Sequence, residues 1–192
     1  APAPPTAPAP TPTAAPTATP VPPTATPAPP TPVPTQVPIA PPVRLSIPTI
    51  EVDAEIERVG LTPDGAMDVP KGPWTVGWYA PGPPAGELGN AAMAGHVDYR
   101  SVGPAVFWRL RELAPGDEVI VHRADGSGRR FVVTGVRAYY TDDIPLAEVF
   151  GPSERPGLNL ITCTGQFSAS ARDYDRRLIV YTEAVGPAFR VR

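Results

Sequence analysis

"EVIVHRADGSGRRFVVTGVRAYY", residues 118–140, joins two apolar runs through a short polar turn. Both runs are rich in β-branched and aromatic residues, which favour strands. The intervening "ADGSG" (124–128) offers two glycines and Asp125, which tolerate the positive φ that hairpin turns require. The stretch therefore predicts a β-hairpin.

The same pattern recurs on both sides of this hairpin. Five further short runs of strand-forming residues are separated by Pro, Gly, Asn and Asp, namely 44–47, 54–61, 90–97, 158–163 and 176–185. Helical candidates are few and short: 104–113, with Phe107, Trp108 and Leu110 facing inward, and 145–150. Seven or eight short strands with little helix favour a sandwich or a closed barrel, because closure removes exposed edges.

The first 42 residues differ in kind from the rest. They hold 18 of the 31 prolines and no charged residue, so they have no apolar face with which to build a core. This composition favours extended polyproline II, and at about 3.1 Å per residue it predicts a stalk on the order of 100 Å long. A disordered tail is the alternative, and either way the fold begins after it. Residues 43–192, about 150 residues, have the size of one ordinary domain.

Charge and cysteine content exclude several classes of protein. The net charge of −3 leaves no basic surplus for nucleic acid. A single cysteine excludes an intramolecular disulfide and a cysteine-cluster zinc site. No apolar stretch approaches the length of a transmembrane helix. Because the chain opens on Ala1 and a proline-rich spacer, we expect an extracellular protein whose N-terminal signal or membrane anchor is missing from this sequence.

Cys163, the only cysteine, ends the apolar run 158–163. The polar segment "TGQFSASARDYD" follows it, and strand ends and loops are where reactive groups are usually presented. The alternative is a buried structural cysteine, which behaves as a small hydrophobe. A nucleophilic cysteine needs a proton partner and a group that holds the developing oxyanion. His96, between a strand and a loop, is favoured over His122 in the hairpin, and Arg176 and Arg177 open the last strand.

Three segments together resemble the sortases, the cysteine transpeptidases of bacterial cell surfaces. They are "AGH" (94–96), "LITC" (160–163) and "RRLIVY" (176–181), in the family's order of His, Cys and Arg. Residues 86–121 resemble class E and F sortases in particular. The resemblance implies a mostly β fold, a closed eight-stranded sortase-type β-barrel with a few short helices, following the stalk.

The resemblance also implies roles for individual residues. Cys163 would be the nucleophile, His96 the general acid toward the leaving amine, and Arg176 the group that binds the substrate or its oxyanion. Arg177, one residue further on, is expected to point to the opposite side of the strand. Thr162 is expected to support substrate binding.

A second set of residues is expected to bind substrate. The segment 141–157 corresponds to the sortase specificity loop, and Ile144, Leu146, Val149 and Phe150 in it could line an apolar groove. A plain surface loop is the alternative. Asp142 and Asp143 lack a second acidic cluster, so neither a metal nor another cofactor is expected.

The implied activity is transpeptidation at the extracellular face of a bacterial membrane. Cys163 would attack the threonine carbonyl of an LPxTG-like C-terminal sorting motif, cleave the Thr–Gly bond through a thioester, and transfer the protein to an amine of peptidoglycan or a pilin. A monomer is expected.

Two other functions compete with the sortase hypothesis. L,D-transpeptidases place His and Cys in one compact motif, whereas His96 and Cys163 are 67 residues apart. A non-catalytic wall-associated β-domain on a proline-rich stalk, with Cys163 in its core, is the alternative outside the enzymes.

Overall fold

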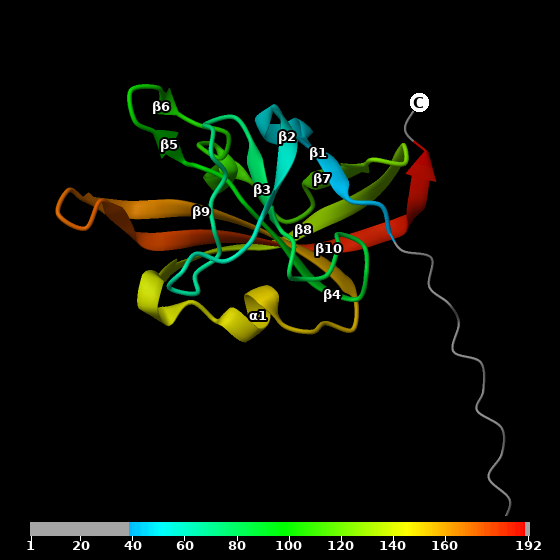
Figure 1. The fold of residues 1–192 in the computed structure, drawn as a ribbon. Helices are drawn as coiled ribbons and strands as arrows, with labels where there is room; N and C mark the ends of the chain where they lie inside the picture. The colour runs from blue at the N-terminus through cyan, green and yellow to red at the C-terminus, as the bar shows by residue number, and fades with distance from the viewer. Residues whose placement is uncertain (1–38, 191–192) are drawn as a thin grey trace, which may run out of the picture. The chain divides into compact units, whose positions relative to one another are not determined.

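A closed eight-stranded β-barrel forms the body of the domain (Figure 1). The computed structural model describes residues 39–190, which belong to one compact unit. The barrel strands follow the order β1-β2-β3-β4-β9-β10-β8-β7. Their bounds are β1 Pro42–Ile47, β2 Val52–Val59, β3 Val76–Tyr79, β4 Gly89–Ala94, β7 Glu118–Arg123, β8 Ser127–Tyr140, β9 Pro156–Ser168 and β10 Asp173–Arg190. The predicted closed barrel is confirmed.

Two short strands and several short helices accompany the barrel strands. β5 (Asp98–Tyr99) and β6 (Gly103–Pro104) form a separate small hairpin, and the helices are η1 Pro48–Ile50, η2 Leu110–Glu112, η3 Thr141–Asp143 and α1 Leu146–Phe150. None of these helices within residues 39–190 has the length and hydropathy needed to span a membrane. Residues 1–38 of the predicted stalk lie outside the described residues, and Pro42, its last residue, opens β1 opposite Arg123.

Several local predictions can be compared with these elements. The hairpin over 118–140 forms as β7 and β8, with Gly126 at φ 75° in its turn. The helix predicted over 104–113 forms only in part: Leu110–Glu112 are a 3-10 helix, Phe107 and Leu110 are buried as expected, and Trp108 is 40% exposed instead of facing inward. The backbone N–H groups of Val106 and Phe107 donate to Pro73 and His96, at 2.9 Å each, so they are not used for helical hydrogen bonds.

Strand β9 is buried on both faces over residues 157–160, a few residues before the candidate site residue Cys163. Leu158 and Leu160 point into the barrel and are fully buried. On the outer face, α1 covers the sheet, where Asn159 Nδ2 donates to the Val149 carbonyl at 2.8 Å and Asn90 Nδ2 to the Glu148 carbonyl at 2.9 Å. The helix therefore forms a wall over the outer face of β4 and β9.

Candidate functional site

Cys163 lies between two neighbouring strands that carry the other candidate residues. β9 pairs in parallel with β4, where Ala94 is opposite Ile161, so His96 and Cys163 each follow two residues beyond that pair. On the other side, antiparallel β10 places Arg177 directly opposite Cys163. Directly opposed residues of adjacent strands project to the same face of a sheet. The outer face of the barrel therefore brings His96, Cys163 and Arg177 together.

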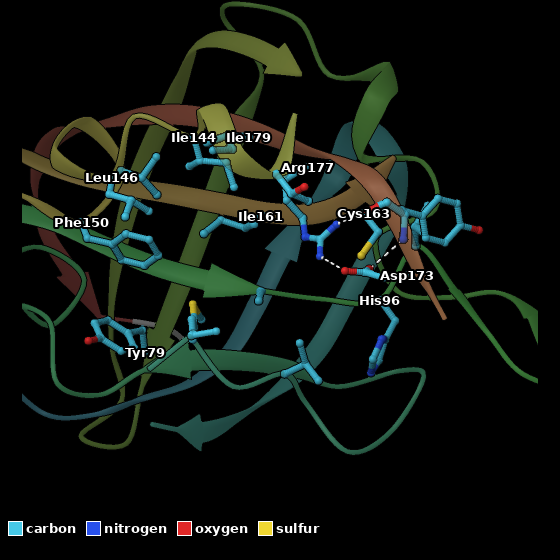
Figure 2. A pocket seen from close by; sticks show the side chains of 18 of the residues that line it. Tyr79, His96, Ile144, Leu146, Phe150, Ile161, Cys163, Asp173, Arg177 and Ile179 are labelled. Carbon is cyan, nitrogen blue, oxygen red and sulfur yellow. Dashed lines mark hydrogen bonds and ion pairs between the residues drawn. The ribbon is translucent and has the colours of Figure 1, made fainter. Parts of the chain in front are cut away.

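These three residues line one end of a pocket of about 1010 Å³ (Figure 2). Ile144, Leu146 and Val149 also line it, as the sequence predicts for groove residues. Figure 2 shows a polar end with Cys163 and Arg177 and, opposite it, an apolar end with Tyr79, Leu146 and Phe150. The pocket thus has the Cys163 thiol at one end and an apolar groove at the other.

The structure places Arg177 in the pocket, whereas Arg176 does not line it. Arg176 stacks on Tyr140, with its guanidinium carbon 4.3 Å from the ring centroid, and its Nη2 donates to the Tyr140 hydroxyl at 2.7 Å. The expectation that Arg176 faces Cys163 and Arg177 faces away is therefore reversed. The side chain of Arg177 is only 21% exposed, and its Nη2 donates to Asp173 Oδ2 at 2.6 Å.

Thr162 also lies elsewhere than expected. It is buried, and its hydroxyl donates to the Gly95 carbonyl at 2.8 Å, on the face of β9 opposite to Cys163. Because side chains alternate along a strand, Thr162 faces the barrel interior, next to Leu178, and does not line the pocket. Its bond instead ties β9 to the residue that precedes His96.

Burial and charge act in opposite directions on the thiol. Burial raises the pKa of Cys163, and the positive charge of Arg177 lowers it, while the carboxylates of Asp173 and Asp98 add to the rise. Burial is the largest of these effects, so the net direction of the pKa is upward. At neutral pH, the resting group is therefore a thiol that needs help to ionise.

Polar residues near the thiol come from the segment 164–175, which was predicted from its composition to be a loop. Strand β9 runs on to Ser168 and β10 already begins at Asp173, so Cys163 lies within a long hairpin. Gly165, at φ 87°, marks a bulge there. The Tyr174 hydroxyl donates to Asp98 Oδ2 at 2.5 Å, which raises the pKa of Tyr174 to about 12. This bond ties β10 to β5, the strand that follows His96.

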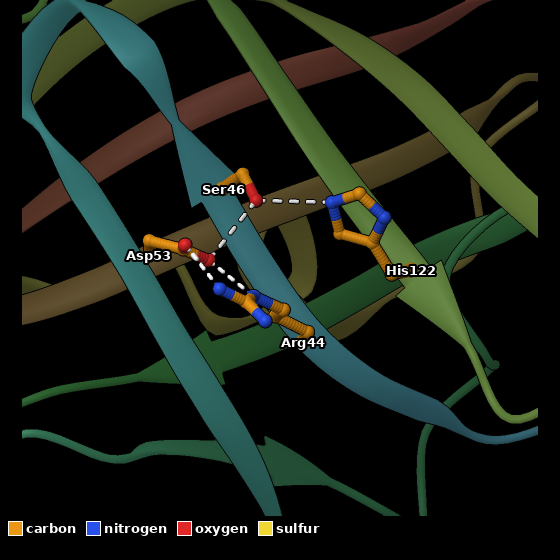
Figure 3. A network of polar contacts seen from close by, with 4 residues as sticks. All are labelled: Arg44, Ser46, Asp53 and His122. Atoms are coloured by element: carbon orange, nitrogen blue, oxygen red, sulfur yellow. Dashed lines mark hydrogen bonds and ion pairs between the residues drawn. The ribbon is translucent and has the colours of Figure 1, made fainter. Parts of the chain in front are cut away.

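The two histidines occupy different environments. His96 lies in the pocket, its Nε2 is 2.8 Å from the Pro70 carbonyl oxygen, and in Figure 2 its ring points away from the Cys163 sulfur. Within residues 39–190, no hydrogen bond joins these two side chains. His122 lies on β7, where its Nε2 is 2.9 Å from Ser46 Oγ beside the Arg44–Asp53 ion pair (Figure 3). Burial lowers the pKa of His122, and Arg44 adds to this effect.

The segment between β2 and β3 forms a wall of the pocket that the sequence analysis missed. Leu61, Met67 and Val69 line the pocket from this segment, and Leu61 and Val69 are more than half exposed. The run "LTPDGAMDVPKGP" contains too few apolar residues at any regular spacing to predict an element. Only the tertiary structure places it opposite α1.

Gly95, directly before His96, has no room for a side chain. A Cβ atom there would lie 2.5 Å from Cδ2 of Phe107, which is fully buried. Gly95→Ala is therefore expected to lower the free energy of unfolding by about 1–3 kcal/mol, the usual cost of overpacking a core. Urea unfolding measures this change. Gly60→Ala is the control, because nothing lies within 4 Å of its added Cβ; equal stability of the two variants would contradict the packing argument.

Comparison with known proteins identifies the family of this domain. The family model described as "Sortase domain" matches residues 45–185. No curated protein matches the chain. A solved sortase from Actinomyces oris is 26% identical with a TM-score of 0.57, and the match covers 75% of this chain and 79% of that one.

Two further solved structures share the fold at lower identity. Listeria monocytogenes sortase A is 14% identical with a TM-score of 0.59, with 80% of this chain and 92% of that one covered. Sortase A from Corynebacterium diphtheriae is 19% identical with a TM-score of 0.56, with 78% of this chain covered but only 63% of that one. Since the family model spans nearly all of the described barrel, this chain belongs to the sortase family.

Proposed function

We propose that this chain is a sortase-type cysteine transpeptidase with Cys163 as nucleophile, His96 as proton donor and acceptor, and Arg177 as the oxyanion-binding group. The observation that carries the proposal is the placement of Cys163 opposite Arg177 and beside His96, at the polar end of a pocket whose other end is apolar. A core cysteine would not open onto such a pocket, and this argues against the non-catalytic alternative.

The proposed reaction has two halves. Neutral His96 first takes the proton of the Cys163 thiol, which gives a thiolate and an imidazolium. The thiolate attacks the threonine carbonyl carbon of a sorting motif, a C–S bond forms, and Arg177 stabilises the oxyanion. The C–N bond then breaks, and the leaving amine takes a proton from the His96 imidazolium. An acceptor amine next attacks the thioester and gives a proton to neutral His96. The C–S bond breaks, and the thiolate is regenerated.

Arg177 retains donors for this task. Its Nη2 donates to Asp173, and its Nη1 donates to the carbonyls of Tyr174 and Arg176 at 2.9 and 3.2 Å. A guanidinium has five N–H donors, so Nε and the second Nη2 hydrogen remain for a substrate oxygen. Asp173 fixes the guanidinium in place, which favours preorganised binding of a developing negative charge.

The substrate that we propose is a C-terminal sorting motif of the LPxTG kind, cleaved between Thr and Gly. The apolar end of the pocket suits the leucine and proline of such a motif, and the acceptor would be an amine of peptidoglycan or of a pilin. We further propose that the enzyme acts as a monomer at the extracellular face of the bacterial membrane. Its similarity to class E and F sortases stays a prediction.

A quenched fluorescent peptide that contains an LPxTG motif provides the test. Incubation with the chain is expected to release the fluorophore and to leave a thioester on Cys163 that intact-protein mass spectrometry detects. Added triglycine or diaminopimelate is expected to yield the corresponding ligated peptide. Failure to form a covalent adduct with any peptide of a library of sorting motifs would contradict the proposed function.

Leu146 tests the groove separately. It lines the pocket and is 62% exposed, so a bound apolar side chain would cover it. Leu146→Asp is expected to raise KM about tenfold at unchanged kcat, because covering most of a leucine contributes roughly 1–2 kcal/mol. Val102→Asp is the matched control, since Val102 is 48% exposed outside the pocket. An unchanged KM in Leu146→Asp would exclude this wall from binding.

A further inference from the structure

The contact of His96 with Pro70 determines which ring nitrogen carries hydrogen. His96 Nε2 lies 2.8 Å from the Pro70 carbonyl oxygen. A carbonyl oxygen can only accept, so the hydrogen of this bond belongs to Nε2. In the neutral ring only one nitrogen is protonated, and Nδ1 therefore carries the lone pair.

The accepting carbonyl is held in place by its surroundings. The N–H of Lys71, the next residue, donates to Glu57 Oε1 at 2.7 Å, and Thr75 Oγ1 donates to the same oxygen at 3.0 Å. Val106 N–H donates to the Pro73 carbonyl at 2.9 Å. The backbone that follows the acceptor of the His96 hydrogen bond is therefore fastened to β2 and to the segment after β6.

Tyr99 strengthens the same arrangement. Its ring packs edge-on against the His96 imidazole, with centroids 5.2 Å apart and planes at 71°. Its hydroxyl donates to the Lys71 carbonyl at 3.1 Å, one residue beyond the acceptor of His96. Two side chains three residues apart thus bind two consecutive carbonyls. The Lys71 bond fixes the Tyr99 ring, and rotation of the imidazole would break its own bond to Pro70 and its packing against that ring.

We propose that Tyr99 is a positioning residue that holds neutral His96 as its Nε2–H tautomer, so that Nδ1 exchanges the proton in catalysis. The imidazolium carries hydrogen on both nitrogens. It gives the Nδ1 hydrogen to the leaving amine and keeps the Nε2 hydrogen, which Nε2 donates to the Pro70 carbonyl throughout. The acceptor amine then returns a proton to Nδ1. The catalytic consequence rests on the proposed function, whereas the tautomer does not.

Nitrogen-15 NMR of the histidine-labelled chain tests the proposal without substrate. The chain contains only two histidines, so in the His122→Gln variant every histidine signal comes from His96. At alkaline pH, where imidazole is neutral, we expect the chemical shifts of a protonated Nε2 and an unprotonated Nδ1. In Tyr99→Phe, which keeps the ring and removes the hydroxyl, we expect a mixture of the two tautomers.

Peptide cleavage supplies the second measurement. Tyr99→Phe is expected to lower kcat about fivefold at unchanged KM, an effect the size of one neutral hydrogen bond. The control is Tyr139→Phe, whose hydroxyl bonds to Tyr181 at 3.1 Å outside the pocket and whose loss is expected to alter neither measurement.

The two measurements separate the two proposals. An Nδ1–H tautomer in the parent chain, or an unchanged tautomer in Tyr99→Phe, overturns the positioning role. A tautomer shift in Tyr99→Phe supports that role even if no variant cleaves any sorting peptide, a result that would count against the proposed function alone.

Discussion

Cys163→Ala is expected to abolish cleavage of a sorting-motif peptide and leave the fold intact. The thiol lines the pocket, so its removal leaves no buried cavity and is expected to change the free energy of unfolding by no more than about 1 kcal/mol. The reaction loses its only nucleophile, because no other cysteine exists in the chain. Peptide cleavage, thioester mass and urea unfolding together measure these effects.

Cys163→Ser provides the control for shape. A hydroxyl fills nearly the same volume but ionises far less readily than a thiol, so this variant is also expected to be inactive. Cleavage retained by Cys163→Ala would contradict the nucleophile assignment. Cleavage retained by Cys163→Ser alone would indicate a stronger general base than this site offers.

The hairpin over 118–140 was predictable because its information is local. Two β-branched runs flank a turn whose glycine adopts the required positive φ, and both strands form within the predicted range. His96 and Cys163 were predicted as site residues from motifs that span only a few residues each, and in the structure both line the pocket. Short-range patterns thus predicted the strands and two of the residues that line the pocket.

The continuation of β9 and β10 was not predictable in the same way. Most residues from Thr164 to Asp175 are polar or small, a composition typical of a loop. In the structure they pair across the hairpin, where Phe167 is opposite Tyr174 and their rings pack with centroids 5.3 Å apart. Cross-strand contacts therefore override the local composition.

The prediction that Arg176 faces Cys163 was wrong for a related reason. In β10, Leu178, Ile179 and Val180 are all buried, because the barrel core covers one face and the pocket region the other. A strand buried on both faces has no apolar–polar alternation that would distinguish its inner from its outer side. The register against β9, which pairs Arg177 with Cys163, is a long-range property that no single segment contains.

Arg177→Ala is expected to slow formation of the thioester by a factor of about 10² to 10³, the usual effect of removing one oxyanion donor. Arg176→Ala is the matched control, because Arg176 contacts Tyr140 outside the pocket and its loss is expected to leave acylation nearly unchanged. Arg177→Lys is expected to recover part of the rate, since an ammonium keeps the charge but not the planar set of donors. Mass spectrometry of the thioester over time measures all three variants.

The pH dependence of Arg177→Ala separates two causes of its low rate. Arg177 lowers the pKa of Cys163 against the effect of burial, so its removal raises that pKa further and decreases the thiolate fraction at neutral pH. Labelling with a methanethiosulfonate depends on the thiolate alone, and it is expected to slow in this variant and to recover as the pH rises. Acylation should recover less, because a higher pH restores the thiolate but not the oxyanion donor. Full recovery of acylation at high pH would limit the role of Arg177 to an electrostatic effect on the thiol. If Arg177→Ala forms the thioester at the normal rate and Arg176→Ala forms it slowly, the oxyanion role belongs to Arg176 instead.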